Sequence, residues 1–376
     1  GSAAPRDAVQ PLEGLASEAY VLHRGEAASS LVGNSGVGTL YAVYEFLKLQ
    51  GCRWVMPGDL GEVVPRRSAL EPVVTRVFNP DYHLVRSVFT GFQQFFPQGG
   101  WIYIDSDELC DWALRNRFNS VWTGGKTLEW GGDRGHGWIQ DSGHSWNATV
   151  APHGKYFEEH PEYFSLVKGK RIPNGQLCLT DEGVFRILVG NLRKRIVGNP
   201  QAQYWSVSQN DTFGYCECDR CAAVNQREGT PMGSILEFVN RVAAEFPDKT
   251  ISTLAYQYSR PAPAHLKPAD NVNIVLCTIE LNRSRPIATD AGAASFRKDM
   301  EDWARITDNI LIWDYVIQFS NLVSPFPNLR VLQPNLRYFV DNSAVAHFQQ
   351  GNREVGGEWA ELRAYLIAKL LWNPDA

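Results

Sequence analysis

The sequence has no excess of basic residues, since 36 Lys and Arg stand against 41 Asp and Glu, for a net charge of −5. This balance excludes the broad basic surface that binds nucleic acids or anionic membranes. No apolar run approaches the length needed to span a membrane, and no signal peptide is visible. The first residues, Gly1 to Ala4, resemble a tag-cleavage scar, so we expect that a secretion signal has been removed.

The sequence also lacks the Gly-x-Ser-x-Gly nucleophile motif and the HExxH metal motif. Four of its seven cysteines stand singly in apolar contexts that are typical of small buried hydrophobes: Cys52, Cys110, Cys178 and Cys277. Cys216, Cys218 and Cys221 form a CxCxxC cluster without the second CxxC that would indicate zinc strongly. The cluster is consistent with a metal that has a fourth ligand, with one disulfide and a spare thiol, or with packed thiols. We expect a structural role for it and assign no metal ligand and no cofactor.

Aromatic residues are plentiful, with 12 Trp, 14 Tyr and 18 Phe. Any single one is most simply a core residue. A surplus of Trp near strand ends nevertheless suits a sugar site, because a flat apolar ring matches the CH face of a pyranose.

Residues 1–78 predict a small α+β domain, with a strand-like run at 18–23 and a helix at 39–50 that follows a Gly-rich turn. From residue 79 onward strands and helices alternate, as in parallel α/β folds. The expected strands cover residues 82–89, 120–123, 177–180, 203–208, 251–258, 272–279, 310–316 and 345–350. The expected helices cover residues 105–117, 181–196, 232–246, 293–306 and 356–372. Eight such units predict a (β/α)8 barrel over residues 79–376.

Amide and acidic side chains follow the fourth expected strand, where Gln209, Asn210 and Asp211 come directly after Ser208. In a β/α barrel the carboxyl ends of the strands carry the active site. The other strand ends are also polar, so we expect their side chains to converge on one pocket. The residues expected to contact the substrate are Arg86, Trp122, His144, Gln209, Tyr256, Tyr258, Trp313, Asp314, Tyr315 and Gln349.

These side chains favour sugar chemistry. Glycoside hydrolysis requires a proton donor for the leaving oxygen and a nucleophile at the anomeric carbon. Asp211, Glu280 and Asp314 are the candidate carboxyl groups. We therefore expect the partner to be a glycan or a glycoprotein, while the sequence does not indicate an oligomeric state.

Several segments together resemble glycoside hydrolase family 163, whose proteins are also described as domain of unknown function 4838. The segments are Gly38–Leu47 with Gly51–Trp54, His160–Phe164, Gln176–Thr180, Ser208–Asp211 with the cysteine cluster, Trp313–Tyr315 and Leu362–Pro374. The resemblance implies a secreted, periplasmic or cell-surface bacterial endo-β-N-acetylglucosaminidase that cuts complex N-glycans. It also implies a small α+β domain before a (β/α)8 barrel. Such proteins usually continue beyond the point where this sequence ends.

The mechanism implied by the resemblance is retaining and substrate-assisted: the 2-acetamido carbonyl attacks the anomeric carbon and forms an oxazoline. Two assignments of roles stay open. In the preferred one, Asp211 is the general acid/base and Asn210 orients the acetamido group. In the rival one, Glu280 is the acid and Asp211 polarises the acetamido N–H. Tyr258 and Tyr315 are expected to donate a hydrogen bond to the acetamido carbonyl.

Two other functions are consistent with the residues. An α-glucuronidase-like barrel hydrolase would need basic groups for the uronate, and Arg86, Arg283 and Arg285 are the candidates. A non-catalytic glycan-binding protein would keep the pocket without turnover.

Overall fold

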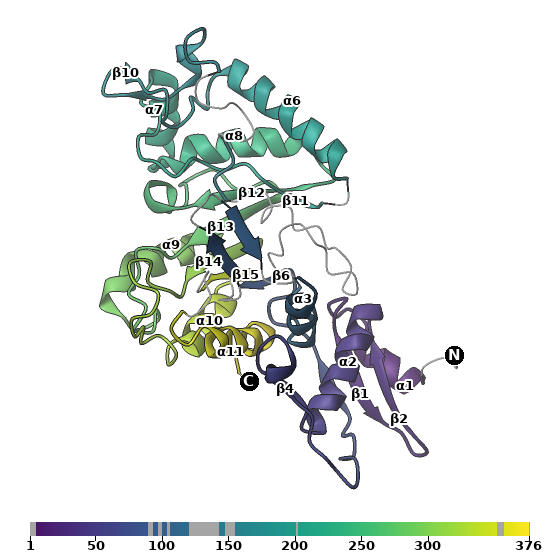
Figure 1. Cartoon of the computed structure of the whole chain (residues 1–376). Helices are drawn as coiled ribbons and strands as arrows, with labels where there is room; N and C mark the ends of the chain where they lie inside the picture. Colours follow the sequence, from purple (N-terminus) through teal and green to yellow (C-terminus); the bar gives the residue numbers. More distant parts are fainter. Residues whose placement is uncertain are drawn as a thin grey trace.

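The computed structural model describes residues 5–88, 93–96, 100–103, 106–119, 143–146, 155–200, 202–351 and 357–375 (Figure 1). Its first part is built on an antiparallel sheet in the order β2-β1-β5. The elements here are α1 (Arg6–Val9), η1 (Gln10–Leu12), β1 (Tyr20–Arg24), β2 (Ser29–Gly33), α2 (Gly36–Leu49), β3 (Arg53–Trp54), η2 (Asp59–Gly61), β4 (Glu62–Val63) and β5 (Arg76–Phe78).

Helix α2 begins at the Gly-rich turn. The Ser35 hydroxyl accepts a hydrogen bond of 3.1 Å from the Gly38 amide and so caps the first turn. The expected helix in this part of the chain is therefore confirmed, and the glycines serve its start.

The main sheet has six parallel strands in the order β11-β12-β13-β14-β15-β6, and it curls into an open half-barrel. Its strands are β11 (Tyr204–Ser206), β12 (Thr250–Ala255), β13 (Val272–Cys277), β14 (Ile310–Tyr315), β15 (Ala344–Gln350) and β6 (Val85–Val88). All six were expected from the sequence. Because the strands are parallel, their carboxyl ends meet at one edge of the sheet.

Helices cover the outer face of this sheet, with α6 to α8 above it and α9 to α11 below it in the view of Figure 1. They are α3 (Ser106–Arg115), α6 (Glu182–Gly198), α7 (Asp219–Glu228), α8 (Met232–Ala244), α9 (Ala294–Ala304), α10 (Leu332–Asp341) and α11 (Ala360–Trp372). The remaining elements are β7 (Gln93–Phe96), β8 (Gly100–Tyr103), η3 (Pro161–Tyr163), β9 (Leu166–Val167), β10 (Lys170–Arg171), η4 (Gln257–Ser259) and η5 (Ala291–Ala293). No helix in the described ranges is both long and apolar enough to cross a bilayer.

Side chains alternate between the two faces of the curled sheet, because successive residues of a strand point to opposite sides. Ile274 and Leu276 of β13 pack outward, in the large core beneath the helices. Val275 and Cys277 pack inward, in a second cluster that also holds Tyr256 and Tyr315. This alternation decides which strand-end residues reach the mouth of the half-barrel.

The complete eight-stranded barrel is not seen in the described residues. The second expected strand, 120–123, lies outside them. Residues 177–180 form no strand: Leu177 makes one antiparallel bridge to Phe164, and a turn follows. Leu177, Cys178 and Leu179 are all buried, and a short apolar run of this kind suits a buried turn as well as a strand.

Candidate active site

Asp211 and Tyr256 meet at the carboxyl ends of β11 and β12. The Tyr256 hydroxyl donates a hydrogen bond of 3.2 Å to Asp211 Oδ1 and accepts one of 3.0 Å from Gln257 Nε2. Burial, and then the nearby charge of Asp211, raise the pKa of Tyr256 above its usual value, so the phenol stays protonated. The Asp211 side chain is 65% exposed, so it remains accessible to a ligand.

The turn that holds Tyr256 has an unusual backbone. Gln257 has a φ of 50°, in the left-handed region that side chains other than glycine rarely adopt. Ser259 fixes this turn, since its hydroxyl accepts hydrogen bonds from the Tyr256 amide and from Gln209 Nε2. Strain of this kind is typical of functional sites, and here it directs Gln257 and Tyr256 toward Asp211.

His144 lies beside the same carboxylate. The segment 143–146 is held along the end of β11, where the Ser206 hydroxyl donates to the Gly143 carbonyl and the Ser208 amide donates to the Ser145 hydroxyl. His144 Nδ1 is 2.8 Å from the Gln209 carbonyl, which can only accept, so Nδ1 carries the proton. His144 Nε2 then faces Asp211 Oδ1 at 3.8 Å.

Aromatic side chains form the inner face next to this cluster. Trp313 and Tyr315 of β14 stack with ring centroids 6.3 Å apart, and Trp313 Nε1 donates to Gln350 Oε1 at 2.8 Å. Burial, and then Cys277, raise the pKa of Tyr315 above its usual value. Phe319, which is exposed, contacts Tyr315 edge-on. The arrangement places aromatic ring surface beside the protonated phenols of Tyr256 and Tyr315.

Glu280 follows β13 at the same edge of the sheet. Its Oε2 accepts a hydrogen bond of 3.0 Å from Arg260, which also pairs with Asp299 at 2.7 Å. The charge of Glu280 contributes to the raised pKa of Cys277, after burial. Glu280 therefore lies near the cluster, but its carboxylate is already engaged by Arg260.

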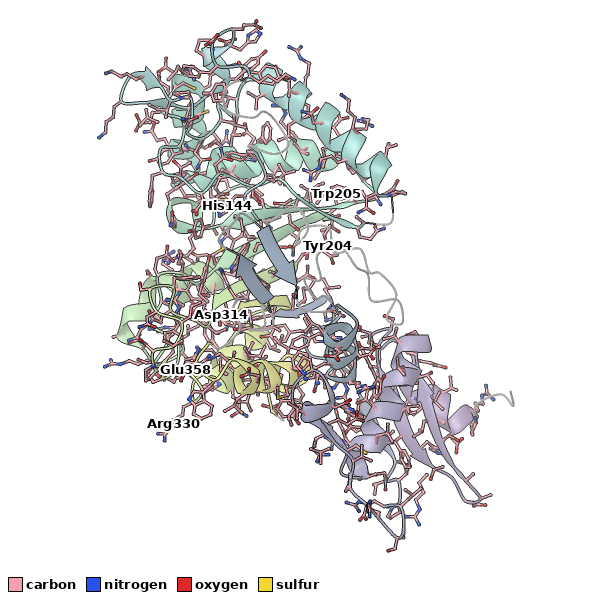
Figure 2. The ribbon with its side chains drawn as sticks, viewed as in Figure 1. His144, Tyr204, Trp205, Asp314, Arg330 and Glu358 are labelled. Atoms are coloured by element: carbon pink, nitrogen blue, oxygen red, sulfur yellow. The ribbon has the colours of Figure 1, made fainter. Side chains whose placement is uncertain are left out.

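Three residues expected to contact substrate lie on the outer face instead: Arg86, Asp314 and Gln349. Asp314 accepts hydrogen bonds from Thr278 and Gln349 in the layer beneath α10, and Figure 2 shows it well away from His144. Burial raises the pKa of Asp314. Arg86 is completely buried and pairs with Glu18 at 2.7 Å. These positions correct the expectation, because the inward residues of β14 are Trp313 and Tyr315.

The other expected residues divide as follows. The Asn210 side chain donates to the Gly175 carbonyl and is buried away from the cluster, so it does not lie where an orienter of the acetamido group should. Gln209 is buried against Ser259. Tyr258 packs against Tyr215, with its hydroxyl buried, and does not meet Tyr315. Trp122 lies outside the described residues.

Sequence reasoning missed Cys277, and it placed Gln257 at the end of the fifth strand without counting it among the site residues. Cys277 was taken as an isolated core residue, although its inward position follows from the alternation in Val272–Cys277. The sequence did not show the backbone conformation of Gln257, because a positive φ on a non-glycine residue leaves no mark in the sequence.

The four thiols of Cys178, Cys216, Cys218 and Cys221 could hold a metal ion. Their sulfur atoms all lie within 4.8 Å of one another. This group lies apart from Asp211 in the region that leads to α7, and it includes Cys178, which the sequence placed among the isolated cysteines.

Comparison with known proteins agrees with this architecture. The family described as "Domain of unknown function (DUF4838)" matches residues 62–376. A family 89 glycoside hydrolase from Clostridium perfringens is similar in structure. Its double variant in complex with GlcNAc-α-1,4-galactose gives a TM-score of 0.56 at 12% identity, over 95% of this chain and 44% of that chain. Its complex with PUGNAc gives a TM-score of 0.55 at 13% identity, over 95% of this chain and 45% of that chain.

The chain thus spans less than half the length of these structures, and at this identity the likeness concerns the fold alone. No curated protein matches the sequence.

Proposed function

The chain belongs to the family described as domain of unknown function 4838, and from this premise we propose that it is a glycoside hydrolase with Asp211 at its catalytic centre. The observation that carries the proposal is the exposed Asp211 carboxylate, held by Tyr256 at the carboxyl edge of the curled parallel sheet. Active sites of β/α barrels lie at this edge. The family 89 enzyme of similar fold is recorded with an acetamido sugar substrate, which supports the same substrate class here.

We assign proton transfer to Asp211. Tyr256 occupies Oδ1, which leaves Oδ2 for the glycosidic oxygen or for the attacking water. His144 Nε2 lies 3.8 Å from the same carboxylate oxygen. A positioned general acid or base of this kind contributes about 10²–10⁴-fold to the rate.

The finer proposal is a retaining, substrate-assisted endo-β-N-acetylglucosaminidase that acts on complex N-glycans. The acetamido oxygen attacks the anomeric carbon and the glycosidic bond breaks as Asp211 protonates the leaving oxygen, which gives an oxazolinium ion that keeps its N–H proton. Water, whose proton passes to Asp211, later opens this ion and restores the acetamide. Tyr315 is the inward phenol next to Tyr256, and its raised pKa keeps it a donor. Of the two tyrosines expected to hold the acetamido carbonyl, we keep Tyr315 and leave out Tyr258, which packs against Tyr215. Trp313 supplies ring surface.

The structure offers less support for an acidic-sugar substrate. Among the described residues near the cluster, Arg260 is paired with Glu280 and Asp299. Arg283 donates to the carbonyls of Tyr315 and Ile279. These contacts engage both guanidinium groups, whereas Arg285, the third candidate, is exposed and lies 3.9 Å from Asp290.

The test is incubation with a glycoprotein that carries biantennary complex N-glycans, followed by mass spectrometry of released glycan. We expect release by the wild type, at least about 10²-fold slower release by Asp211→Asn, and unchanged release by Asp248→Asn, an exposed acid of the same type. Equal rates for the three proteins would refute the assignment. Binding without release by the wild type would favour the glycan-binding alternative.

A further inference from the structure

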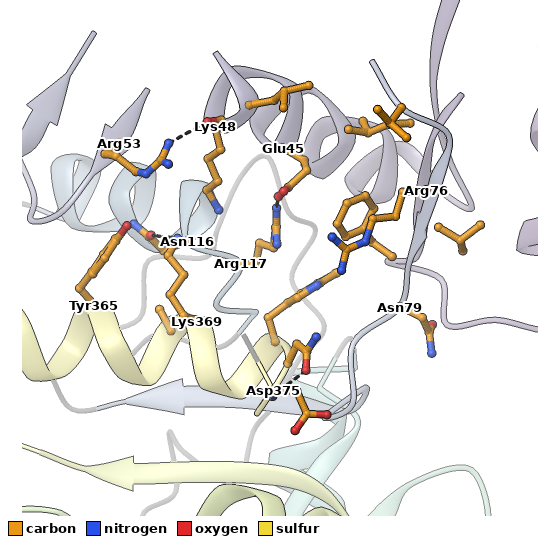
Figure 3. Close-up of a pocket in the computed structure, with 18 of the residues that line it drawn as sticks. Glu45, Lys48, Arg53, Arg76, Asn79, Asn116, Arg117, Tyr365, Lys369 and Asp375 are labelled. Carbon is orange, nitrogen blue, oxygen red and sulfur yellow. Dashed lines mark hydrogen bonds and ion pairs between the residues drawn. The ribbon is translucent and has the colours of Figure 1, made fainter. Parts of the chain in front are cut away.

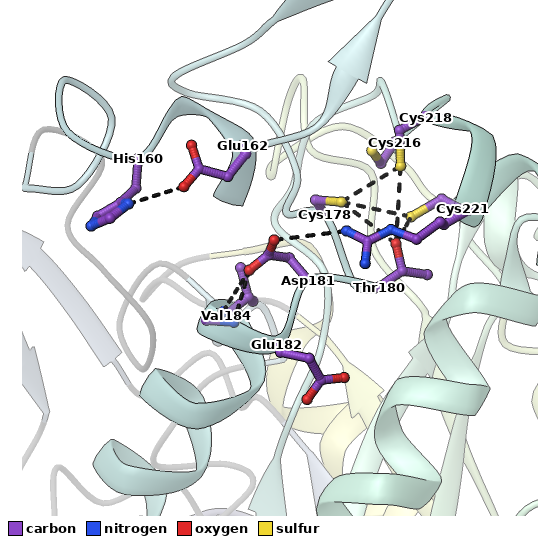
Figure 4. A network of polar contacts seen from close by, with 12 residues as sticks. His160, Glu162, Cys178, Thr180, Asp181, Glu182, Val184, Cys216, Cys218 and Cys221 are labelled. Carbon is purple, nitrogen blue, oxygen red and sulfur yellow. Dashed lines mark hydrogen bonds and ion pairs between the residues drawn. The ribbon is translucent and has the colours of Figure 1, made fainter.

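The four clustered cysteines have the geometry of a tetrahedral metal site (Figure 4). Cys178 Sγ lies 3.6 Å from Cys218 Sγ and 4.0 Å from Cys221 Sγ. A zinc ion with four Zn–S bonds of about 2.3 Å separates its sulfur atoms by about 3.8 Å. The thiols are therefore already spaced as the ligands of one ion would be.

The surroundings of the thiols suit the negative charge of bound thiolates. Cys218 is the N-cap residue of α7 and Cys221 lies in its first turn, where the helix dipole favours negative charge. The Leu166 amide donates to Cys216 Sγ at 3.4 Å, and Arg171 lies 3.9 Å from the same sulfur. Four thiolates around one divalent ion carry a net charge of −2, which these donors and the cation partly balance.

We propose that Cys178, Cys216, Cys218 and Cys221 bind one structural zinc ion. Four protein ligands close the coordination sphere, as in structural rather than catalytic zinc sites. The site joins the turn before α6 to the start of α7, and it closes the loop that begins at Asp211. Cys178 supplies the ligand that the CxCxxC cluster lacks.

Elemental analysis of the purified full chain, dialysed against metal-free buffer, tests the proposal. We expect one zinc ion per chain in the wild type, loss of most of it in Cys178→Ser, and full retention in Cys52→Ser, which removes a buried cysteine outside the cluster. Cobalt substituted for zinc should show the intense thiolate-to-metal absorption of a four-sulfur site.

If the variants do not fold, the metal content, thiol titration and mass of the wild type are sufficient to test the proposal. Absence of zinc together with four freely titrating thiols would overturn the proposal in favour of packed thiols. A mass 2 Da lower under non-reducing conditions would overturn it in favour of a disulfide. Stoichiometric iron in place of zinc would refute the identity of the ion.

A second inference concerns a cavity of about 730 Å³ between the first part of the chain and α11 (Figure 3). Lys48 enters it from α2 and Lys369 from α11, and Arg117 lies between them. Glu45 is paired with Arg117, and Asp375 is paired with Arg337. Within the described ranges no ion pair joins either lysine to a carboxylate. Lys369 Nζ donates to the neutral Asn116 amide oxygen at 3.3 Å and lies 4.6 Å from the centre of the Tyr365 ring.

Burial, and then Arg117, lower the pKa of Lys48 well below its usual value. Burial also lowers the pKa of Lys369, to about 8. Burial is the main cause of both shifts; the charge of Arg117 adds to them and the charge of Glu45 opposes them. The volume falls within the range of about 300–1,000 Å³ that is typical of small-molecule sites, and it exceeds what an inorganic ion fills.

We infer that this cavity binds a small organic anion of up to about disaccharide size, through Lys48 and Lys369. Titration calorimetry with D-glucuronate, inorganic phosphate and uncharged D-glucose tests this. Glucuronate should bind, and Lys48→Met or Lys369→Met should weaken binding by about 10–100-fold, the scale of one charged hydrogen bond. Lys194→Met, an exposed lysine on α6, should bind as the wild type does.

Equal binding of glucose and glucuronate would overturn the anion selectivity, and equal binding of phosphate would overturn the organic ligand. No binding of any probe to the wild type would overturn the site itself. None of these results bears on cleavage of N-glycans, so the proposed function is tested separately.

Discussion

The buried ion pair between Glu18 and Arg86 gives the sharpest test of how the first part of the chain is attached to the main sheet. Arg86 lies on β6 and Glu18 precedes β1, and both side chains are almost completely buried. The Arg86 guanidinium also donates to the Arg117 carbonyl at 2.9 Å and the Tyr82 carbonyl at 2.7 Å. Loss of Arg86 should therefore destabilise the fold without acting on the site.

The size of the effect follows from what each substitution leaves behind. Removing one partner of a buried ion pair costs about 3–5 kcal/mol, because the other charge remains buried. Glu18→Gln keeps the two carbonyl contacts of Arg86, so we expect about 3 kcal/mol. Arg86→Met leaves Glu18 and both carbonyls unpaired, and each buried carbonyl adds about 1 kcal/mol or more. Arg86→Met should thus lie at or above the upper end of the range.

Urea unfolding followed by tryptophan fluorescence measures these differences. Glu71→Gln is the control, since the exposed pair of Glu71 with Arg67 should contribute less than about 1 kcal/mol. The reasoning fails if Arg86→Met unfolds like the wild type while its activity on glycan falls. That result would return Arg86 to the substrate contacts expected from the sequence.

Three other outcomes are expected. Tyr256→Phe removes the hydrogen bond to Asp211 and should lower kcat by about 10–100-fold, as measured with a chromogenic N-acetylglucosaminide, with little change in stability. Gly143→Ala would place a Cβ 2.5 Å from Trp313 Cζ3, so it should destabilise the fold by about 1–3 kcal/mol and shift the tryptophan emission. Burial lowers the pKa of His347 from 6.5 to about 3, so acid protonates this residue in the unfolded chain first; stability should fall by up to about 1.4 kcal/mol per pH unit from pH 6.5 toward 3. His347→Gln should flatten this dependence in unfolding curves recorded at several pH values.

The six parallel strands could be predicted because their sequences are unambiguous. Val272–Cys277 and Ile310–Tyr315 are short, largely apolar runs of six residues between helical segments, which is typical of strands in a parallel sheet. The run Leu177–Thr180 looks similar, yet it forms a bridge and a turn. Its backbone hydrogen bonds join it to the segment around Phe164. The periodicity of the sequence does not indicate which segment will be the hydrogen-bond partner.

The sequence predicted which strand ends lie at the candidate site, but it did not predict on which face of the sheet each side chain lies. Asp211, Tyr256 and Tyr315 were expected together, and they do lie on the inner side. Asp314 and Gln349 were expected with them, although they point outward. Both faces of these strands are covered and both carry apolar and polar residues, so the sequence pattern alone does not tell the inward from the outward residues.

The cysteine cluster shows a different limit. The CxCxxC spacing is local and visible, whereas Cys178 is 38 or more positions away from its three partners. Nothing in a single sequence connects such distant positions. The fold alone brings the turn before α6 to the start of α7.

The two proposed ligand sites, the mouth of the half-barrel and the cavity between α2 and α11, differ in charge, and this difference favours a different ligand for each. At the mouth of the half-barrel, the cations Arg260 and Arg283 are consumed by acidic side chains and carbonyls, and the free charge is the Asp211 carboxylate. The Asp211 carboxylate does not repel a neutral acetamido sugar, whereas it would repel the carboxylate of a uronate. In the cavity between α2 and α11 the balance is reversed, because Lys48 and Lys369 have no carboxylate partner in the described ranges. We therefore propose an anionic ligand for the cavity and a neutral sugar for the mouth of the half-barrel.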